Sequence, residues 1–234
     1  MSISVAAGAQ FQPASDQSML VSFGERITPQ AHRQVVQLLR LLQSDPVSGI
    51  RNFHPAYCSI LVKFDPLKLR HDDVEILLRT YLGRLESVPM PEARQVEIPV
   101  CYGGDYGPDL ADVCALHGLT HSQVIDLHTS VPYLVYFLGF VPGFAYLGEL
   151  PGDLITPRLA VPRRSVPPGS VGIAGSQTGV YPFATPGGWR LLGRTPMKMF
   201  HPDGGALSVL SIGDQVRFTS ISPEQFTALE KAQR

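Results

Sequence analysis

The amino-acid sequence predicts an α+β amino-terminal domain followed by a mainly-β barrel domain. Within the first 90 residues, two helical stripes alternate with short apolar runs. From residue 133 onwards, short β-rich runs recur between turns. The 22 glycines and 21 prolines are unevenly distributed, since residues 139–196 hold 20 of them and the first 90 residues hold ten. This shift in composition predicts two parts with different architecture.

The first helix has a well-marked start and end. A strand at residues 18–23, ended by Gly24, precedes it. Thr28 comes before Pro29, which places an N-cap residue ahead of a proline at the first helical position. Asp45, followed by a proline, ends the helix. Apolar residues recur at helical spacing between these points, at Ala31, Val35, Leu38, Leu39 and Leu42.

Two strands and a second helix come next. Residues 50–54 and 59–64 have the composition of strands, and the second run alternates apolar and polar side chains. Asp72 or Asp73 is expected to cap a helix with an apolar stripe at Val74, Leu77, Leu78, Tyr81, Leu82 and Leu85. A final strand at residues 96–100 would complete the order βαββαβ, which is that of a ferredoxin-like sandwich.

Pro89, Pro91 and Glu92 mark a linker between the two parts. We therefore predict a ferredoxin-like α+β domain at residues 16–92 and a β-barrel domain at residues 93–234. Residues 1–15 are predicted to be disordered.

The second part begins with turns and two short helices. A helix is expected at residues 109–116, and Thr120 with Gln123 forms a capping box that begins another, which ends near His128. Seven short runs then suggest a barrel or a sandwich, and residues 222–232 suggest a terminal helix. The runs are 133–138, 163–166, 170–174, 179–183, 189–194, 207–210 and 215–220.

Charge and motifs exclude several classes of protein. The 19 basic and 20 acidic residues leave a net charge of −1, without the excess of positive charge typical of nucleic-acid binders. The chain has no G-x-x-x-x-G-K-[ST] phosphate loop and no G-x-S-x-G nucleophile elbow. We expect partners to be neutral surfaces or small molecules held in a pocket.

The sequence also favours a cytoplasmic location. The three cysteines are too few and too scattered for a disulfide framework. The first ten residues lack the basic and apolar regions of a signal peptide, and no apolar run is long enough to span a membrane.

The histidines provide a candidate base but no metal site. His117 and His121 are four residues apart, but a glycine and a predicted N-cap lie between them, so we predict no metal. His128 lies just before the Gly/Pro-rich region and could act as a general base, because the ordinary pKa of histidine is near 6.5. A structural histidine that bonds a neighbouring loop is the alternative.

Five arginines fall within the Gly/Pro-rich region, and together they would suit an anionic ligand. They are Arg158, Arg163, Arg164, Arg190 and Arg194. The glycine-rich segments 169–175 and 186–189 could form anion-binding nests or simply tight barrel corners. Trp189, the single tryptophan, could line a pocket or fill a core.

Ordered motifs beyond residue 103 resemble a known family. They include GGDYGPDL at 103–110, YFLGFVPGFAYL at 136–147, VPPGSVGIAG at 166–175, QTGVYP at 177–182 and TPGGWRLLGRTP at 185–196. The sequence is similar to the allophanate hydrolase subunit 1 and kinase-inhibitor-like family, some of whose members belong to 5-oxoprolinase. The likeness covers nearly the whole chain beyond its first dozen residues.

The resemblance implies that the second domain is a cyclophilin-like barrel without prolyl isomerase activity. It implies a subunit of a hydrolase complex that uses ATP to open 5-oxo-L-proline to L-glutamate and is inactive alone. The implied partners are a homologous subunit, similar to allophanate hydrolase subunit 2, and a third protein of the LamB/YcsF (lactam-utilisation) type.

Two other functions remain open. Some family members resemble inhibitors of a sensor histidine kinase, and in that case residues 133–144 and Phe183 would form an apolar protein-binding groove. Related domains also occur in urea carboxylase and allophanate hydrolase, which suggests a role in urea metabolism.

Residue type and position within these motifs give a candidate pocket. His128 is the acid/base candidate, and Arg163 is the candidate that binds the substrate carboxylate. The remaining substrate-binding candidates are Arg158, Tyr136, Phe144, Gln177, Tyr181 and Trp189.

Overall fold

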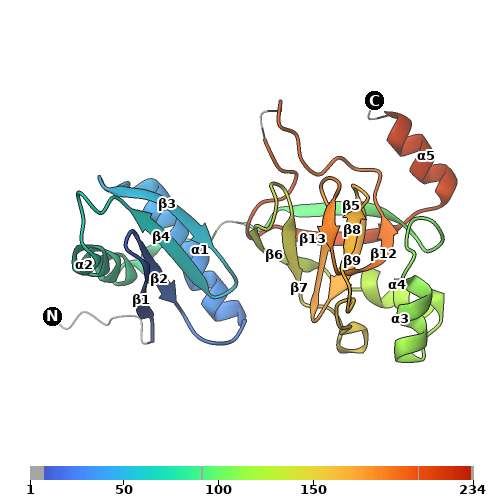
Figure 1. Cartoon of the computed structure of the whole chain (residues 1–234), viewed down its shortest axis with the longest axis horizontal. Coiled ribbons are helices and arrows are strands. Elements are labelled where there is room, and N and C mark those ends of the chain that lie inside the picture. Colours follow the sequence, from blue (N-terminus) through green and yellow to red (C-terminus); the bar gives the residue numbers. More distant parts are fainter. Residues whose placement is uncertain (1–7, 91, 205, 233–234) are drawn as a thin grey trace. The chain divides into compact units, whose positions relative to one another are not determined.

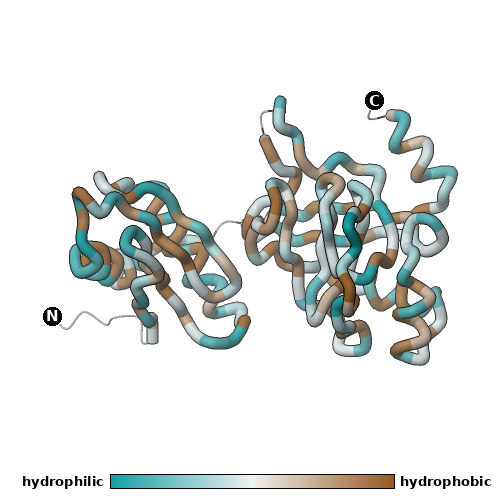
Figure 2. The backbone as a smooth tube through the Cα atoms, in the orientation of Figure 1, coloured by the Kyte–Doolittle hydropathy of each residue, from teal (hydrophilic) through white to brown (hydrophobic). Residues whose placement is uncertain are grey.

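The computed structural model describes residues 8–90, 92–204 and 206–232 (Figure 1). The chain divides into two compact units, residues 1–92 and residues 93–234. In both units apolar stretches of the backbone are interrupted at short intervals by polar ones (Figure 2). The expected disorder of residues 1–7 and the linker position Pro91 lie outside the described residues.

The amino-terminal unit is a four-stranded antiparallel sheet with two helices. The strand order is β1-β2-β4-β3, and the strands are β1 (Gln10–Ser15), β2 (Ser18–Ser22), β3 (Ile50–Pro55) and β4 (Ser59–Phe64). Helices α1 (Pro29–Ser44) and α2 (His71–Leu82) pack against the sheet. The alternation predicted for β4 is confirmed, because Ile60, Val62 and Phe64 are buried while Lys63 is exposed.

Two predictions for this unit are wrong. Residues 96–100 do not add a strand to its sheet, because they lie in strand β5 of the second unit. The edge position beside β2 is taken instead by β1, whose residues 10–15 were expected to be disordered. Strand β1 is largely polar and contains Pro13, so it carries little hydrophobic signal, and proline is tolerated on an edge strand. The Arg79 guanidinium stacks 4.5 Å from the centroid of the Phe11 ring and holds this edge against α2.

The predicted start of α1 is confirmed and that of α2 is wrong. The Thr28 hydroxyl accepts a hydrogen bond from the Ala31 N–H at 3.1 Å, and Pro29 is the first helical residue. In α2 the N-cap is Arg70, and Asp73 accepts the Arg70 N–H at 2.9 Å from the third helical position. Asp73 therefore stabilises the helix start from inside the first turn, where acidic side chains also favour the helix dipole.

The second unit is a closed seven-stranded barrel of order β10-β7-β6-β13-β5-β12-β9. Its strands are β5 (Gln95–Tyr102), β6 (Tyr133–Leu138), β7 (Ala145–Gly148), β9 (Ser170–Ala174), β10 (Gln177–Val180), β12 (Arg190–Arg194) and β13 (Gln215–Ser220). Strands β5 and β13 pair in parallel, and the other neighbours are antiparallel. Strands β8 (Arg163–Val166) and β11 (Thr185–Gly187) form a separate pair.

Most predicted β-runs match strands of the second unit. Strand β10 begins two residues before the predicted run and ends at Val180, and β7 and β11 were not predicted because they are short and contain glycine. Residues 207–210 form no strand, and only an isolated bridge joins Phe200 to Ser208.

The helices of the second unit pack against its strands. They are α3 (Leu110–His117), α4 (His121–Thr129) and α5 (Pro223–Ala232), and a short 3₁₀ turn lies at Gly152–Leu154. The first unit has a 3₁₀ turn at Leu85–Ser87. The predicted capping box is confirmed, because the Thr120 hydroxyl accepts the Gln123 N–H and the Gln123 side chain accepts the Thr120 N–H.

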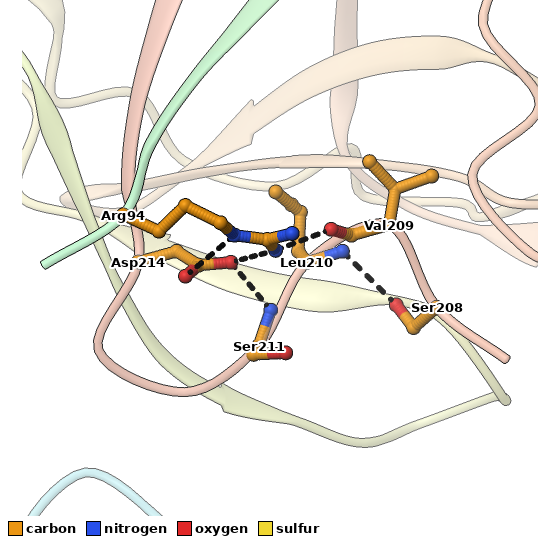
Figure 3. A network of polar contacts seen from close by, with 6 residues as sticks. All are labelled: Arg94, Ser208, Val209, Leu210, Ser211 and Asp214. Atoms are coloured by element: carbon orange, nitrogen blue, oxygen red, sulfur yellow. Dashed lines mark hydrogen bonds and ion pairs between the residues drawn. The ribbon is translucent and has the colours of Figure 1, made fainter. Parts of the chain in front are cut away.

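A buried carboxylate fastens the parallel pair of strands (Figure 3). Asp214 accepts hydrogen bonds from Arg94 Nε at 3.2 Å, from Arg94 Nη2 at 2.5 Å and from the Ser211 N–H at 2.7 Å. Arg94 also donates to the Val209 carbonyl at 2.6 Å. The network therefore joins the residue that precedes β5 to the turn that precedes β13.

We expect Asp214→Asn to lower the free energy of unfolding by about 1–2 kcal/mol, because it weakens two charge-assisted hydrogen bonds to a half-exposed arginine. Urea unfolding followed by circular dichroism measures this change. Glu97→Gln, an exposed carboxylate on β5, is the matched control and should change the midpoint little. Equal midpoints for both variants would show that the network contributes no stability.

Candidate functional site

His128 lies inside the barrel and its side chain is fully buried. The Tyr102 hydroxyl lies 2.7 Å from Nδ1, and the Thr178 hydroxyl lies 2.9 Å from Nε2. The imidazole also stacks on Phe218 at a ring-centroid distance of 4.6 Å. The Tyr133 hydroxyl donates to the His128 carbonyl at 2.8 Å.

These contacts determine the tautomer of His128. The Thr178 hydroxyl donates its hydrogen to the Gly172 carbonyl at 3.1 Å, so it can only accept from Nε2–H. Nδ1 is then unprotonated and accepts the Tyr102 hydroxyl hydrogen. Burial lowers the pKa of His128 to about 3. A neutral imidazole with both nitrogens bonded and no solvent contact fits the structural alternative rather than a general base.

A second cluster packs on the outer side of the barrel wall. It contains Phe144, Val166, Ala174, Tyr181, Trp189 and Leu191, with Tyr146 packed against it. The Phe144 ring meets Tyr181, Trp189 and Tyr146 edge-on, at centroid distances of 5.2, 5.4 and 5.0 Å. These are favourable aromatic geometries, and they hold the rings in fixed orientations.

The β-strand alternation separates this outer cluster from His128. In β10, Thr178 bonds His128 inside the barrel, so the next residue, Gly179, faces outward. A Cβ on Gly179 would lie 3.0 Å from Phe144 and 3.2 Å from Trp189. The candidate pocket is therefore divided by the barrel wall, with His128 on one side and Phe144, Tyr181 and Trp189 on the other.

Arg163 and the segment that contains Arg158 lie next to Gly187 and Gly188, at the edge of the outer cluster. Gly187 pairs with Arg163 between β11 and β8, and a Cβ at Gly187 would lie 2.4 Å from the Tyr181 hydroxyl. The Gly188 carbonyl accepts the Leu159 N–H at 2.8 Å, which brings the segment containing Arg158 to the same place. Burial raises the pKa of Tyr181, and the Trp189 backbone hydrogen bond and the charges of both arginines partly oppose this rise.

The two arginines differ in what they already bind. The Arg163 guanidinium forms an ion pair with Asp109, and its side chain is 28% exposed. Arg158 is exposed to solvent, and its charge lowers the pKa of Tyr146 against the larger effect of burial. Arg158 is thus the more accessible cation of this region, which we call the outer-wall site and define as Arg158, Arg163, Tyr146, Tyr181 and Trp189.

Tyr136 and Gln177 lie at another point on the wall. Gly148 pairs with Gln177, and a Cβ at Gly148 would lie 3.0 Å from the Tyr136 ring. Gln177 precedes Thr178, so its side chain points away from the barrel interior. Burial is the main cause that raises the pKa of Tyr136, and the charge of Glu149 adds to it.

Sequence reasoning missed two residues of the outer-wall region. Tyr146 lies within the motif at 136–147 but is not among the predicted pocket residues, although its ring stacks on Phe137 at 4.5 Å and meets Trp189 at 6.0 Å. Asp109 was expected only to begin a helix, and its side chain is 5% exposed. A single aspartate next to Pro108 in a glycine-rich turn carries no signal of burial.

Within residues 8–90, 92–204 and 206–232, no group of three or more histidine, cysteine, aspartate and glutamate side chains could hold a metal ion. No helix in the part of the chain that the structure describes is long and apolar enough to cross a membrane.

Comparisons with known proteins identify the family. Residues 9–210 match the family described as "Carboxyltransferase domain, subdomain C and D". The chain belongs to this carboxyltransferase-domain family. A relative from Bacillus subtilis (strain 168), the B subunit of 5-oxoprolinase, is 39% identical over 95% of this chain and 97% of its own length. The protein of the same name from Escherichia coli O157:H7 is 60% identical over 66% of this chain and 70% of its length.

Solved structures show the same family fold. The crystal structure of TTHA0988 is 36% identical, covers 88% of this chain and has a TM-score of 0.77. This chain spans only 40% of the TTHA0988 chain. Urea amidolyase of Kluyveromyces lactis matches 95% of this chain with a TM-score of 0.77, and this chain spans 15% of the amidolyase chain. At 18% identity the likeness shows the fold alone.

We expect the burial of His128 to make stability depend on pH. Its pKa is near 6.5 when unfolded and about 3 when folded, so the unfolded state binds the proton first as the pH falls. The free energy of unfolding should be unaffected by this group above pH 6.5. Below that it should fall by up to about 1.4 kcal/mol per pH unit until the pH nears 3.

Urea unfolding at several pH values between 4 and 8 measures this slope. His128→Gln should be less stable at neutral pH and have a shallower slope, whereas His121→Gln, at an exposed position, should keep the parent slope. Burial also lowers the pKa of His32 to about 4, so part of the slope should remain in His128→Gln. Equal slopes for His128→Gln and the parent would contradict the assignment.

Proposed function

We propose that this chain is the B subunit of an ATP-dependent 5-oxoprolinase complex, which opens 5-oxo-L-proline to L-glutamate. The observation that carries the proposal is the match to proteins named as the B subunit of 5-oxoprolinase, which extends over 95% of this chain in one case and reaches 60% identity in another. On this basis we assign the two units as a ferredoxin-like domain and a cyclophilin-like barrel, and we place the complex in the cytoplasm.

The outer-wall site suits the substrate of this reaction. The lactam carries one carboxylate and a small, largely apolar ring. The exposed Arg158 guanidinium can take the carboxylate, and the ring can pack on the half-buried Tyr146, which Trp189 supports from beneath. The developing negative charge of a phosphorylated intermediate would also favour a site with two guanidinium groups. Phe144 fixes the aromatic walls, while Tyr136 and Gln177 lie further along the outer wall.

The chain is expected to contribute part of a composite site. Neither a phosphate loop nor a nucleophile elbow occurs in its sequence, so ATP is used by the complex and its site need not lie on this chain. We propose two partners: a homologous subunit similar to allophanate hydrolase subunit 2, and a protein of the LamB/YcsF type. The greater length of TTHA0988 supports a larger assembly, because this chain spans only two fifths of it.

One observation favours a second candidate function, the inhibition of a sensor histidine kinase. The Phe140 side chain is 59% exposed, and its φ of 69° lies in the left-handed region, which is uncommon for an aromatic residue. The surrounding residues 138–143 line a shallow open depression of about 300 Å³. An exposed aromatic side chain at such a depression is typical of protein-binding surfaces. The urea carboxylase alternative has no comparable support beyond the fold.

We expect ATP-dependent release of glutamate from 5-oxoproline only when this chain is combined with both partner proteins. Glutamate formed in single, pairwise and complete mixtures is the measurement. Turnover by this chain alone would overturn the composite site. No turnover by the complete mixture, together with lower autophosphorylation of a sensor kinase, would favour the second function.

Arg158→Gln should raise KM for 5-oxoproline at least about tenfold, equivalent to roughly 1.4 kcal/mol of lost carboxylate binding, with kcat little changed. Steady-state kinetics of the complete complex measures both constants. Arg164→Gln is the matched control, because Arg164 is exposed and is the neighbour of Arg163 on β8, where alternate side chains face opposite sides. Equal KM values for the two variants would remove Arg158 from the site.

A further inference from the structure

Asp109 joins three segments that surround the outer-wall site. It is the N-cap residue of α3, and its side chain is almost fully buried. Its Oδ1 accepts a hydrogen bond from Arg163 Nη2 on β8 at 2.5 Å. Its Oδ2 accepts the Leu191 N–H on β12 at 2.7 Å. One carboxylate thus fixes an arginine of the site and the strand that follows Trp189.

The two carboxylate oxygens of Asp109 accept from different donors, so only one of them bonds Arg163. A guanidinium and a carboxylate can form two parallel hydrogen bonds, but here the second oxygen is committed to Leu191. Arg163 Nη1 is buried and has no hydrogen-bond partner among the described residues. A buried donor on a charged group costs free energy when it is left unpaired, so an acceptor from outside this set would be favourable there.

The orientation of that donor depends on Asp109. Arginine has many rotamers, and its side chain loses substantial entropy when it is held in one of them. The ion pair to a buried, doubly bonded carboxylate selects one orientation of the Arg163 guanidinium, whose charge opposes the larger rise that burial causes in the pKa of Tyr181. It also neutralises Arg163, so that Arg158 provides the net positive charge of the site.

We infer that Asp109 is a positioning residue, which holds Arg163 so that its Nη1 donates to the carboxylate of the substrate alongside Arg158. The inference rests on the proposed function for the identity of the substrate. A positioning role for Asp109 differs from a purely structural role in the ligands whose binding it affects. A structural role predicts the same effect on neutral and anionic ligands, whereas a positioning role affects the ligand that carries the carboxylate.

Asp109→Asn tests the inference with least disturbance, because the amide oxygen can still accept the Leu191 N–H while the ion pair to Arg163 is lost. Asp112→Asn is the matched control: Asp112 lies on the same helix, is 68% exposed and is 3.8 Å from Arg190. Arg163→Lys and the double variant Asp109→Asn/Arg163→Lys complete a double-mutant cycle. Thermal unfolding of each variant shows whether it is folded.

Two readouts distinguish positioning from stability. The first is the kinetics of the complete complex with 5-oxoproline, with inhibition by the neutral 5-oxoproline carboxamide measured in parallel. The second is the ¹⁵N spectrum of the arginine guanidinium groups in the full-length chain, in which the signal lost in Arg163→Lys identifies Arg163. Hydrogen bonding to Asp109 should keep its two Nη groups distinct.

For Asp109→Asn we expect KM for 5-oxoproline to rise at least about tenfold and kcat to stay within about twofold. Inhibition by the carboxamide should be unchanged, and the Nη signals of Arg163 should merge. The rise in KM should be largely absent when Arg163 is already lysine. Asp112→Asn should match the parent in every respect.

Other results would overturn the inference. Unchanged KM and an unchanged Arg163 spectrum in Asp109→Asn would show that Asp109 does not position the arginine. Equal weakening of 5-oxoproline and carboxamide binding would assign Asp109 a structural role only. If the parent complex does not turn over 5-oxoproline, the proposed function fails first, and the substrate-binding role of Asp109 fails with it.

Discussion

The alternation of side chains across the barrel wall is the constraint on which the rest of the second unit depends. In a closed barrel each strand presents one set of side chains to the interior and the next to the outside. Ile173 and Leu192 belong to the interior core, whereas their neighbours Ala174 and Leu191 belong to the outer cluster. The wall therefore has two packed faces, and successive residues of a strand pack alternately against the interior core and the outer cluster.

The two faces provide different chemistry. Inside, burial keeps His128 neutral, and the hydrogen bonds from Tyr102 and to Thr178 satisfy both of its ring nitrogens. Outside, the aromatic rings pack edge to face around Phe144, Arg163 lies on β8, and the segment that contains Arg158 bonds to Gly188 next to β11. Charge is tolerated on this face because Arg158 reaches solvent and Arg163 is neutralised by Asp109.

Close approach of the backbone explains the glycine-rich motifs. Gly187 allows the Tyr181 hydroxyl to lie at a distance that a Cβ would prevent, and Gly179 leaves room for the tight packing of Phe144 and Trp189. Gly148 likewise leaves room for the Tyr136 ring, which a Cβ at this position would crowd. The high glycine and proline content of residues 139–196 thus reflects tight packing on the outside of the barrel as well as turns.

The local elements that depend on neighbours along the chain could be predicted from the sequence. The Thr28 cap, the box at Thr120 and Gln123 and the apolar stripe of α1 are short-range patterns, and all are present. The family could also be predicted, through long ordered motifs. The sequence did not show that residues 96–100 join the barrel, because strand pairing depends on residues far apart in the chain. Strand β1 pairs with β2 in the first unit, and β5 pairs with β13 in the second. Only the tertiary structure decided that His128 and Trp189 lie on opposite sides of the wall and that Asp109 meets Arg163, since burial and ion pairing depend on partners 50 or more residues away.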